Sequence, residues 1–121
     1  MRSCLIVDDS TVIRKAIRRM VEPLFDKVDE AADGQIALDS CIQSMPTVVM
    51  LDWNMPVMSG IEFLRALRKT DGGQAPFVVL CTTETSFEHI QEALTEGANE
   101  YIMKPFNEDI IKEKLEIAGA I

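Results

Sequence analysis

Short apolar runs alternate with segments of helical periodicity along the whole chain. The apolar runs predict buried strands at 4–7, 48–51, 77–81 and 101–103, with a weaker strand at 27–31. After each strand, apolar side chains recur every three or four residues, which predicts helices at 12–21, 36–41, 60–69, 87–94 and 108–118. The pattern therefore predicts five strand–helix units in strict alternation.

The predicted helix starts carry side chains that suit helix caps. Ser10 or Thr11 can cap the first helix, and Asn107 can cap the last one. The helix at 87–94 has an apolar stripe of Phe87, Ile90 and Leu94. In the last helix, the periodicity predicts four residues facing inward: Ile110, Ile111, Leu115 and Ala118.

Continuous apolar strands, as opposed to alternating ones, indicate that both faces of the sheet are covered. This favours a parallel sheet with helices on each side, which is an α/β fold. Right-handed crossovers restrict five such units to a doubly wound, flavodoxin-like sheet with strand order 2-1-3-4-5 and five helices. The length of 121 residues suits one domain, and we expect residues 1–121 to form it without an attached output domain.

The composition excludes several classes of function. A net charge of −8 argues against nucleic acid or an anionic membrane as the main partner, because both attract basic surfaces. No apolar run approaches 18 residues, and the N-terminus lacks the apolar core of a signal peptide, so we expect a cytoplasmic protein without membrane insertion. The three cysteines, Cys4, Cys41 and Cys81, lie among apolar residues and are expected to be buried free thiols.

Polar side chains stand where four of the predicted strands end. Asp8 and Asp9 follow the first strand, Asp52 the third, Thr82 the fourth and Lys104 the fifth. Because the carboxyl ends of parallel strands meet at one edge of the sheet, we expect these side chains to lie together.

Three clustered carboxylates with no His or Cys ligand favour a hard cation, and Mg²⁺ suits few protein oxygens best. The charges also balance, since three acids carry −3 against +2 from Mg²⁺ and +1 from Lys104. A metal, a lysine and a hydroxyl around one carboxylate are the groups that phosphoryl transfer uses.

Four motifs at the strand ends resemble the response-regulator receiver family, and within it the single-domain chemotaxis regulators. The motifs are "LIVDDS" at 5–10, "MLDWNMPVMSG" at 50–60, "LCTTE" at 80–84 and "EYIMKPF" at 100–106. Each alone is only suggestive, but all four occur in order, and the resemblance covers essentially the whole chain.

The resemblance implies that Asp52 is the phosphoacceptor, which attacks the phosphorus of a phosphohistidine on a partner protein. It implies that Asp9 binds Mg²⁺ directly and that Asp8 does so directly or through water. Asp52 itself and the backbone carbonyl of Asn54 complete the implied protein ligands.

The resemblance also implies the groups around the phosphoryl oxygens and the signal that follows. Thr82 donates a hydrogen bond to one oxygen and Lys104 pairs with another, and the Lys104–Pro105 peptide bond is cis. Tyr101 is the implied switch residue, turning inward when Thr82 moves toward the phosphate. The surface of the fourth helix, fifth strand and fifth helix then changes for a downstream partner.

The lifetime of the phosphorylated state is expected to depend on Asn54 and Glu84, which flank the path of the hydrolytic water in the family. Both have the residue types of fast-turnover chemotaxis regulators, so we expect a short-lived state. Thr83 departs from the Ala or Gly usual in the family, and its bulk works toward slower access of phosphodonors.

The expected role is a signalling switch of a two-component system, phosphorylated by a histidine kinase or a histidine phosphotransfer protein. By analogy, the first expected target is a flagellar motor switch protein; a phosphorelay shuttle or a phosphate sink is the alternative. We expect a monomer, with a dimer on phosphorylation as an option. The chain is not expected to be an enzyme, beyond catalysing its own phosphorylation and dephosphorylation.

Three other interpretations stay open. A Mg²⁺-dependent phosphohydrolase of the haloacid-dehalogenase type needs an acid two residues after the nucleophile, where this chain has Asn54. A phosphorylation-independent adaptor does not need the complete set of strand-end residues. The chain can also be a receiver domain excised from a longer response regulator.

Side chains near these motifs have less specific interpretations. Arg14, Lys15, Arg18 and Arg19 give the first helix a basic face, which is either simply solvated or borders the docking site of phosphodonor proteins. His89 is expected to be a solvated histidine on the outer face of its helix.

Overall fold

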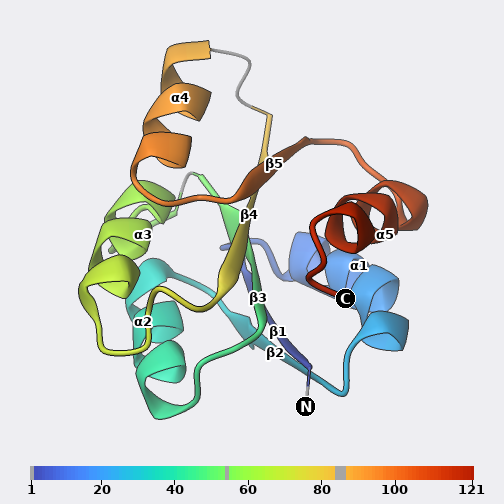
Figure 1. Ribbon diagram of the computed structural model, residues 1–121, viewed down its shortest axis with the longest axis horizontal. Coiled ribbons are helices and arrows are strands. Elements are labelled where there is room, and N and C mark those ends of the chain that lie inside the picture. Colours follow the sequence, from blue (N-terminus) through green and yellow to red (C-terminus); the bar gives the residue numbers. More distant parts are fainter. Residues whose placement is uncertain (1, 54, 84–86) are drawn as a thin grey trace.

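A five-stranded parallel sheet forms the centre of the protein, seen here in a computed structural model that describes residues 2–53, 55–83 and 87–121. The strands run in the order β2-β1-β3-β4-β5 (Figure 1). Their bounds are β1 Ser3–Val7, β2 Lys27–Ala31, β3 Val48–Asp52, β4 Phe77–Thr82 and β5 Glu100–Met103. This confirms the predicted doubly wound, flavodoxin-like sheet and its order.

In the residues that the structure describes, five α-helices connect and follow the strands, as predicted. They are α1 Thr11–Val21, α2 Gly34–Gln43, α3 Gly60–Lys69, α4 Phe87–Thr95 and α5 Glu108–Ile117, with a short 3₁₀ turn at Glu22–Leu24. Ser10 caps α1 by accepting from the backbone N–H of Ile13 at 3.2 Å. Asn107 caps α5 by accepting from the N–H of Ile110 at 3.0 Å. Capping oxygens satisfy N–H groups that have no partner inside the helix.

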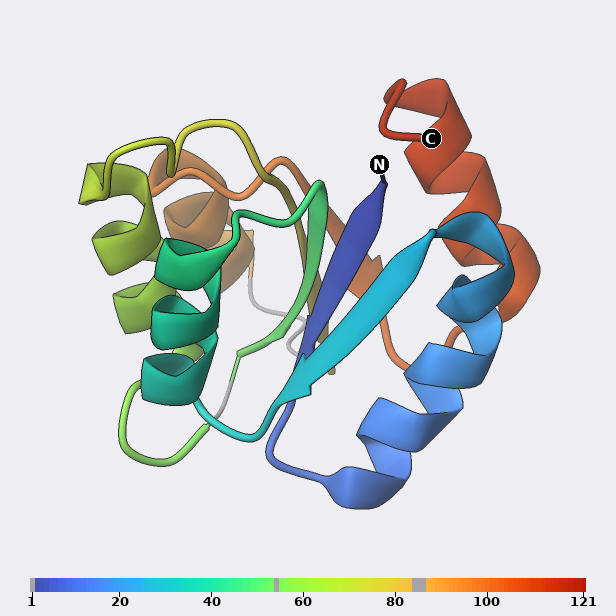
Figure 2. The same cartoon turned by 90° about the horizontal axis from the view of Figure 1, so that it is seen from below.

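Helices cover both faces of the sheet. One face packs against α1 and α5, and the other packs against α2, α3 and α4 (Figures 1 and 2). Buried strand residues alternate between the two sides, so that Leu5 and Val7 lie in one core cluster while Cys4 and Ile6 lie in the other. Both layers exclude water from the central strands, which explains the continuous apolar runs within β1, β3 and β4.

The cysteines are buried free thiols, as expected. Burial raises the pKa of the Cys41 thiol to about 11 and that of the Cys81 thiol to about 12, so neither thiol ionises near neutral pH. In the described part of the chain, no helix has both the length and the apolar character needed to cross a membrane.

The inward faces of two helices differ from the prediction. In α5, Ile111 and Leu115 are buried as predicted. Ile110 is 38% exposed and Ala118 is also exposed, so the prediction that these two residues face inward was wrong. In α4, Ala93 is buried and Phe87 is 76% exposed. A helix contacts its sheet over a narrower stripe than its apolar residues span, and the packing of neighbouring helices selects that stripe.

Candidate functional site

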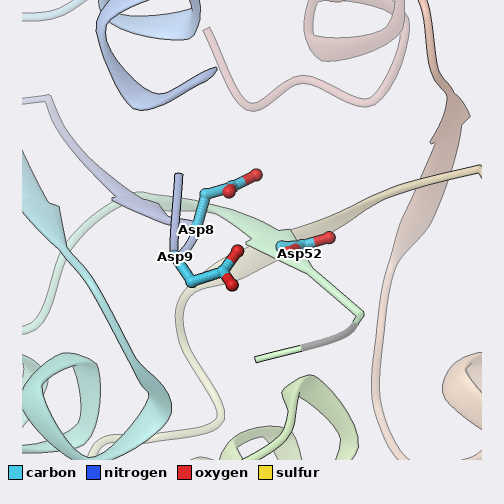
Figure 3. Close-up of side chains that lie close together, drawn as sticks. All are labelled: Asp8, Asp9 and Asp52. Atoms are coloured by element: carbon cyan, nitrogen blue, oxygen red, sulfur yellow. The ribbon is translucent and has the colours of Figure 1, made fainter. Parts of the chain in front are cut away.

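Three carboxylates meet at the carboxyl edge of the sheet. Asp8 and Asp9 follow β1, and Asp52 is the last residue of β3. Each offers an oxygen that lies within 4.8 Å of the others, and Figure 3 shows the three side chains gathered at this edge. Asp8 is buried, the side chain of Asp52 is only 13% exposed, and Asp9 is open to solvent. The convergence predicted for these acids is therefore found.

Asp8 is held by its backbone and by its side chain. Its N–H donates to the carbonyl of Ala31 in β2 at 3.1 Å. Its Oδ1 accepts from the N–H of Ser10 at 2.9 Å, a contact across the turn into α1. Aspartate side chains commonly accept from the backbone two residues later, which stabilises such turns. The buried carboxylate therefore has a defined orientation at the strand end.

Asp52 is positioned by the chain that follows it. The N–H of Gly60, at the start of α3, donates to the carbonyl of Trp53 at 3.0 Å. A Cβ atom on Gly60 would lie 2.3 Å from the carbonyl oxygen of Asp52, so only glycine fits there without a shift of the backbone. Sequence reasoning missed this role of Gly60; the available signal was a glycine directly after the capping serine Ser59.

Lys104 joins two of the acids. Its Nζ lies 3.2 Å from Oδ2 of Asp8 and 3.3 Å from Oδ1 of Asp52. Its backbone N–H donates to the carbonyl of Thr82 at 2.8 Å, which ties the end of β5 to the end of β4. The bond between Lys104 and Pro105 is cis, the isomer that the resemblance implies.

The electrostatics of the site favour an additional cation. Burial and the nearby charge of Asp8 raise the pKa of Asp52, although Lys104 works in the opposite direction. Burial disfavours the ammonium of Lys104, but Asp52 and Asp8 outweigh it and raise its pKa. Three acids and one lysine leave a local charge of −2, and all the side-chain donors are oxygens. This donor set fits a hard divalent cation such as Mg²⁺, with Asp8, Asp9 and Asp52 as its protein ligands.

The other expected switch residues lie on the two adjacent strands. Thr82 is buried at the end of β4, opposite Met103 of β5. Tyr101 is half-buried in β5 and packs against the core. The Nζ of Lys114 in α5 lies 5.7 Å from the centre of the Tyr101 ring, within the range of a cation–π contact.

Three residues were expected to affect the lifetime of the phosphorylated state, and the structure describes only one of them. Asn54 and Glu84 lie outside the described residues. Thr83 is exposed and lines an apolar surface pocket between α1 and the segment that follows β5. Lys104 and Phe106 line the same pocket, so Thr83 stands at the border of the acidic site.

The basic face of α1 forms ion pairs with an acidic residue that the sequence analysis did not single out. Glu30 of β2 forms ion pairs with Arg14 at 3.1 Å, Lys15 at 2.7 Å and Arg18 at 2.9 Å. Three of the four cations on this face therefore have an internal partner, and a simply solvated face does not describe them.

His89 is exposed, as expected, but its ring also contacts the chain's only tryptophan. The ring centres of His89 and Trp53 lie 5.6 Å apart with the planes tilted by 32°. This contact links α4 to the segment that follows Asp52.

The family model of the response regulator receiver domain matches residues 4–116. The chain is 38% identical over 113 residues to the chemotaxis protein CheY of Pseudomonas aeruginosa, covering 93% of this chain and 91% of that protein. It is 35% identical over 115 residues to CheY1 of Helicobacter pylori, covering 93% of each.

Solved structures of receiver-type proteins also resemble this chain. CheY4 of Vibrio cholerae superposes with a TM-score of 0.89 at 36% identity, covering 97% of this chain and 98% of that one. The receiver domain of the sensor histidine kinase PA1611 of Pseudomonas aeruginosa, solved with a magnesium ion coordinated in its active-site cleft, superposes with a TM-score of 0.86 at 25% identity, covering 96% and 95%. The chain therefore belongs to the response regulator receiver family, and as a homologue of CheY it is a phosphoaccepting signalling switch.

Proposed function

We propose that the chain accepts a phosphoryl group on Asp52 from a phosphohistidine of a histidine kinase or histidine phosphotransfer protein. The observation that carries this proposal is the ammonium of Lys104 placed between Asp8 and Asp52, at the edge where three carboxylates meet. A buried nucleophilic carboxylate beside a fixed cation is suited to receive a phosphoryl group, because the cation offsets the charge that arrives.

In the transfer step, an Oδ atom of Asp52 attacks the phosphorus and the P–N bond to the donor histidine breaks. Its electron pair stays on the imidazole nitrogen, so the products are an acyl phosphate on Asp52 and a free histidine. Lys104 pairs with one phosphoryl oxygen, and the hydroxyl of Thr82 donates to another. Asp8, Asp9 and Asp52 would hold Mg²⁺, which would neutralise charge on the transferring group. Water later hydrolyses the acyl phosphate, which releases inorganic phosphate and restores the Asp52 carboxylate.

The output surface of this proposal is formed by α4, β5 and α5. Movement of Thr82 toward the phosphoryl group frees space beside β5, and Tyr101 turns into it. Contacts that change in this step include that of Lys114 with the Tyr101 ring. Because the relatives are chemotaxis proteins, we propose a motility partner, with a flagellar motor switch protein as the first candidate.

The test of the acceptor uses a small phosphodonor such as acetyl phosphate with Mg²⁺, followed by intact-protein mass measurement. The wild type should gain one phosphoryl group, and Asp52→Asn should gain none. Asp39→Asn, a change at an exposed acid on α2, is the matched control and should behave as the wild type. A normally phosphorylated Asp52→Asn variant would remove the assignment.

The test of the output uses the immobilised chain to capture proteins from a cell extract. It compares the proteins retained with and without beryllofluoride, which mimics the phosphoryl group on Asp52. A motor switch protein retained only with beryllofluoride supports the motility role. Retention of a histidine phosphotransfer protein alone supports the phosphorelay shuttle or phosphate sink. Catalytic turnover of a phosphomonoester would instead support a phosphohydrolase.

A further inference from the structure

Arg14 of α1 connects the acidic site to β2. Its Nη1 donates to the backbone carbonyl of Asp8 at 2.7 Å, and its Nε donates to Glu30 at 3.1 Å. Its Nη2 donates to the hydroxyl of Thr11 at 3.2 Å. The side chain is only 13% exposed, so this guanidinium is a largely enclosed part of the site's frame.

The carbonyl that Arg14 binds belongs to the peptide unit between Asp8 and Asp9, the two acids proposed to bind the cation. The preceding peptide unit is fixed by the bond from the Asp8 N–H to Ala31. Residues of β2 therefore restrain the peptide units on both sides of Asp8: Ala31 acts directly, and Glu30 acts through Arg14. Because a peptide unit is planar, restraining its carbonyl also restrains the start of the next residue.

We propose that Arg14 is a positioning residue, which holds the Asp8–Asp9 peptide unit so that both carboxylates face the bound Mg²⁺. The inference rests on the proposed function, since it concerns the same cation site. The planar guanidinium carries donors in a fixed arrangement, so it can bind Glu30 and the Asp8 carbonyl at once. A lysine ammonium has the charge but not this geometry.

Because Glu30 has other cationic partners, replacing Arg14 tests its effect on Mg²⁺ binding without leaving Glu30 unpaired. Lys15 and Arg18 lie 2.7 Å and 2.9 Å from Glu30, so the acid keeps two cations when Arg14 is removed. Lys15 is 56% exposed and pairs with Glu30 on the outer side of α1, whereas Arg14 also binds Asp8. Lys15 is therefore the matched control residue, with the same charge and the same partner.

The sign of the change in Mg²⁺ affinity distinguishes positioning from simple electrostatics. A guanidinium near a cation site repels the cation, so removing its charge alone would strengthen Mg²⁺ binding. Removing a positioning residue loosens the ligands and weakens binding. Loss of a group that orients metal ligands commonly costs about 10-fold or more in metal affinity.

The experiment compares Mg²⁺ titrations of the wild type, Arg14→Met, Arg14→Lys and Lys15→Met. Binding is read from the fluorescence of Trp53, the only tryptophan, and independently from the rise in melting temperature with added Mg²⁺. We expect Arg14→Met and Arg14→Lys each to bind about 10-fold more weakly than the wild type. Lys15→Met should bind Mg²⁺ as tightly as the wild type or more tightly.

Unchanged or tighter binding by both Arg14 variants would overturn the inference and leave the proposed function standing. An equal weakening by Lys15→Met would also overturn it, because the effect would then belong to the charge around Glu30. If Arg14→Met fails to fold, Arg14→Lys decides, since it keeps the charge beside Glu30. A wild type that binds no Mg²⁺ would overturn the proposed cation site and this inference together.

Discussion

The ammonium nitrogen of Lys104 lies 3.3 Å from Oδ1 of Asp52, a contact between residues 52 positions apart in the sequence. The same nitrogen lies 3.2 Å from Asp8, so one cation is shared by two enclosed carboxylates. Lys104 thus joins the ends of β1, β3 and β5.

Lys104→Met should destabilise the metal-free protein, because Asp8 and Asp52 would lose their shared counter-charge. Removing one partner of a buried ion pair costs about 3–5 kcal/mol, and the 20% exposure of Lys104 reduces this to about 2 kcal/mol. Urea unfolding in the presence of a chelator measures the loss. Added Mg²⁺ should restore part of the stability by replacing the missing charge.

The pH dependence gives a second readout for Lys104. Its raised pKa means that its contribution to stability is complete below the usual lysine value and is lost as pH rises through the folded-state value. The wild type should therefore lose stability in the alkaline range, and Lys104→Met should lack that component. Equal stability of the two proteins in chelator at neutral pH would contradict the prediction.

Asp52→Asn should raise the melting temperature of the metal-free protein at neutral pH. The pKa of Asp52 is raised, so its contribution is favourable below the usual aspartate value and is lost as pH rises through the folded-state value. At neutral pH the charged group opposes folding, and the amide removes that charge. The gain should be a few degrees and should shrink as pH falls. A lower melting temperature for Asp52→Asn than for the Asp39→Asn control would contradict this.

Glu30→Gln should destabilise the protein by about 2 kcal/mol at neutral pH, because its side chain is only 12% exposed and three cations surround it. Burial opposes ionisation of Glu30, but Lys15, Arg18 and Arg14 outweigh it and lower its pKa. This contribution is present above the usual glutamate pKa and is lost as pH falls through the lower folded-state value.

Measuring the free energy of unfolding as the pH is lowered tests this expectation. The difference in that free energy between the wild type and Glu30→Gln should become smaller in the acid range. The control is Glu116→Gln, because Glu116 is 53% exposed and its ion pair with Lys112 is long at 3.8 Å. Such exposed pairs contribute about 0–1 kcal/mol. The prediction would be wrong if Glu30→Gln lowered the free energy of unfolding no more than Glu116→Gln does.

Gly60→Ala should disturb Asp52 as well as lower stability. The added methyl group would lie 2.3 Å from the Asp52 carbonyl oxygen and 3.1 Å from that of Trp53, so the backbone after β3 must shift. Overpacking of this kind costs about 1–3 kcal/mol. Mg²⁺ binding should weaken together with stability.

Gly119→Ala separates these two effects. Gly119 has a φ of +75°, but an added methyl group would meet no atom within 4 Å. The change should cost about 1 kcal/mol of backbone strain and leave Mg²⁺ binding unchanged. If Gly60→Ala also left Mg²⁺ binding unchanged, the close approach to Asp52 would have no role in placing the carboxylate.

The order of elements and the residues at the strand ends followed from the sequence alone. Continuous apolar runs required a sheet covered on both faces, and parallel strands bring their carboxyl ends to one edge. For that reason the sequence predicts that Asp8, Asp52 and Lys104 lie together. The motifs around them added the family, which the comparisons then showed.

Some side chains were visible in the sequence only as residue types. Arg68 looks like an ordinary basic residue near the end of α3, yet its guanidinium donates to the carbonyls of Gly73, Pro76 and Gly97. It also donates to the side chain of Asn99 at 3.0 Å and so ties together the loops before β4 and β5. Periodicity carries no information about such contacts, because they depend on loop backbone brought together from separate parts of the chain.

The sequence by itself determined which chemical groups reach the active edge, because strand order and strand ends follow from local apolar patterns. Only the tertiary structure decided how those groups are held. Glu30 collects three cations, Arg14 reaches the carbonyl of Asp8, and Gly60 admits the chain beside Asp52. Each of these contacts joins a helix to a strand or to the residue that follows a strand, so its geometry exists only once the helices have packed onto the sheet.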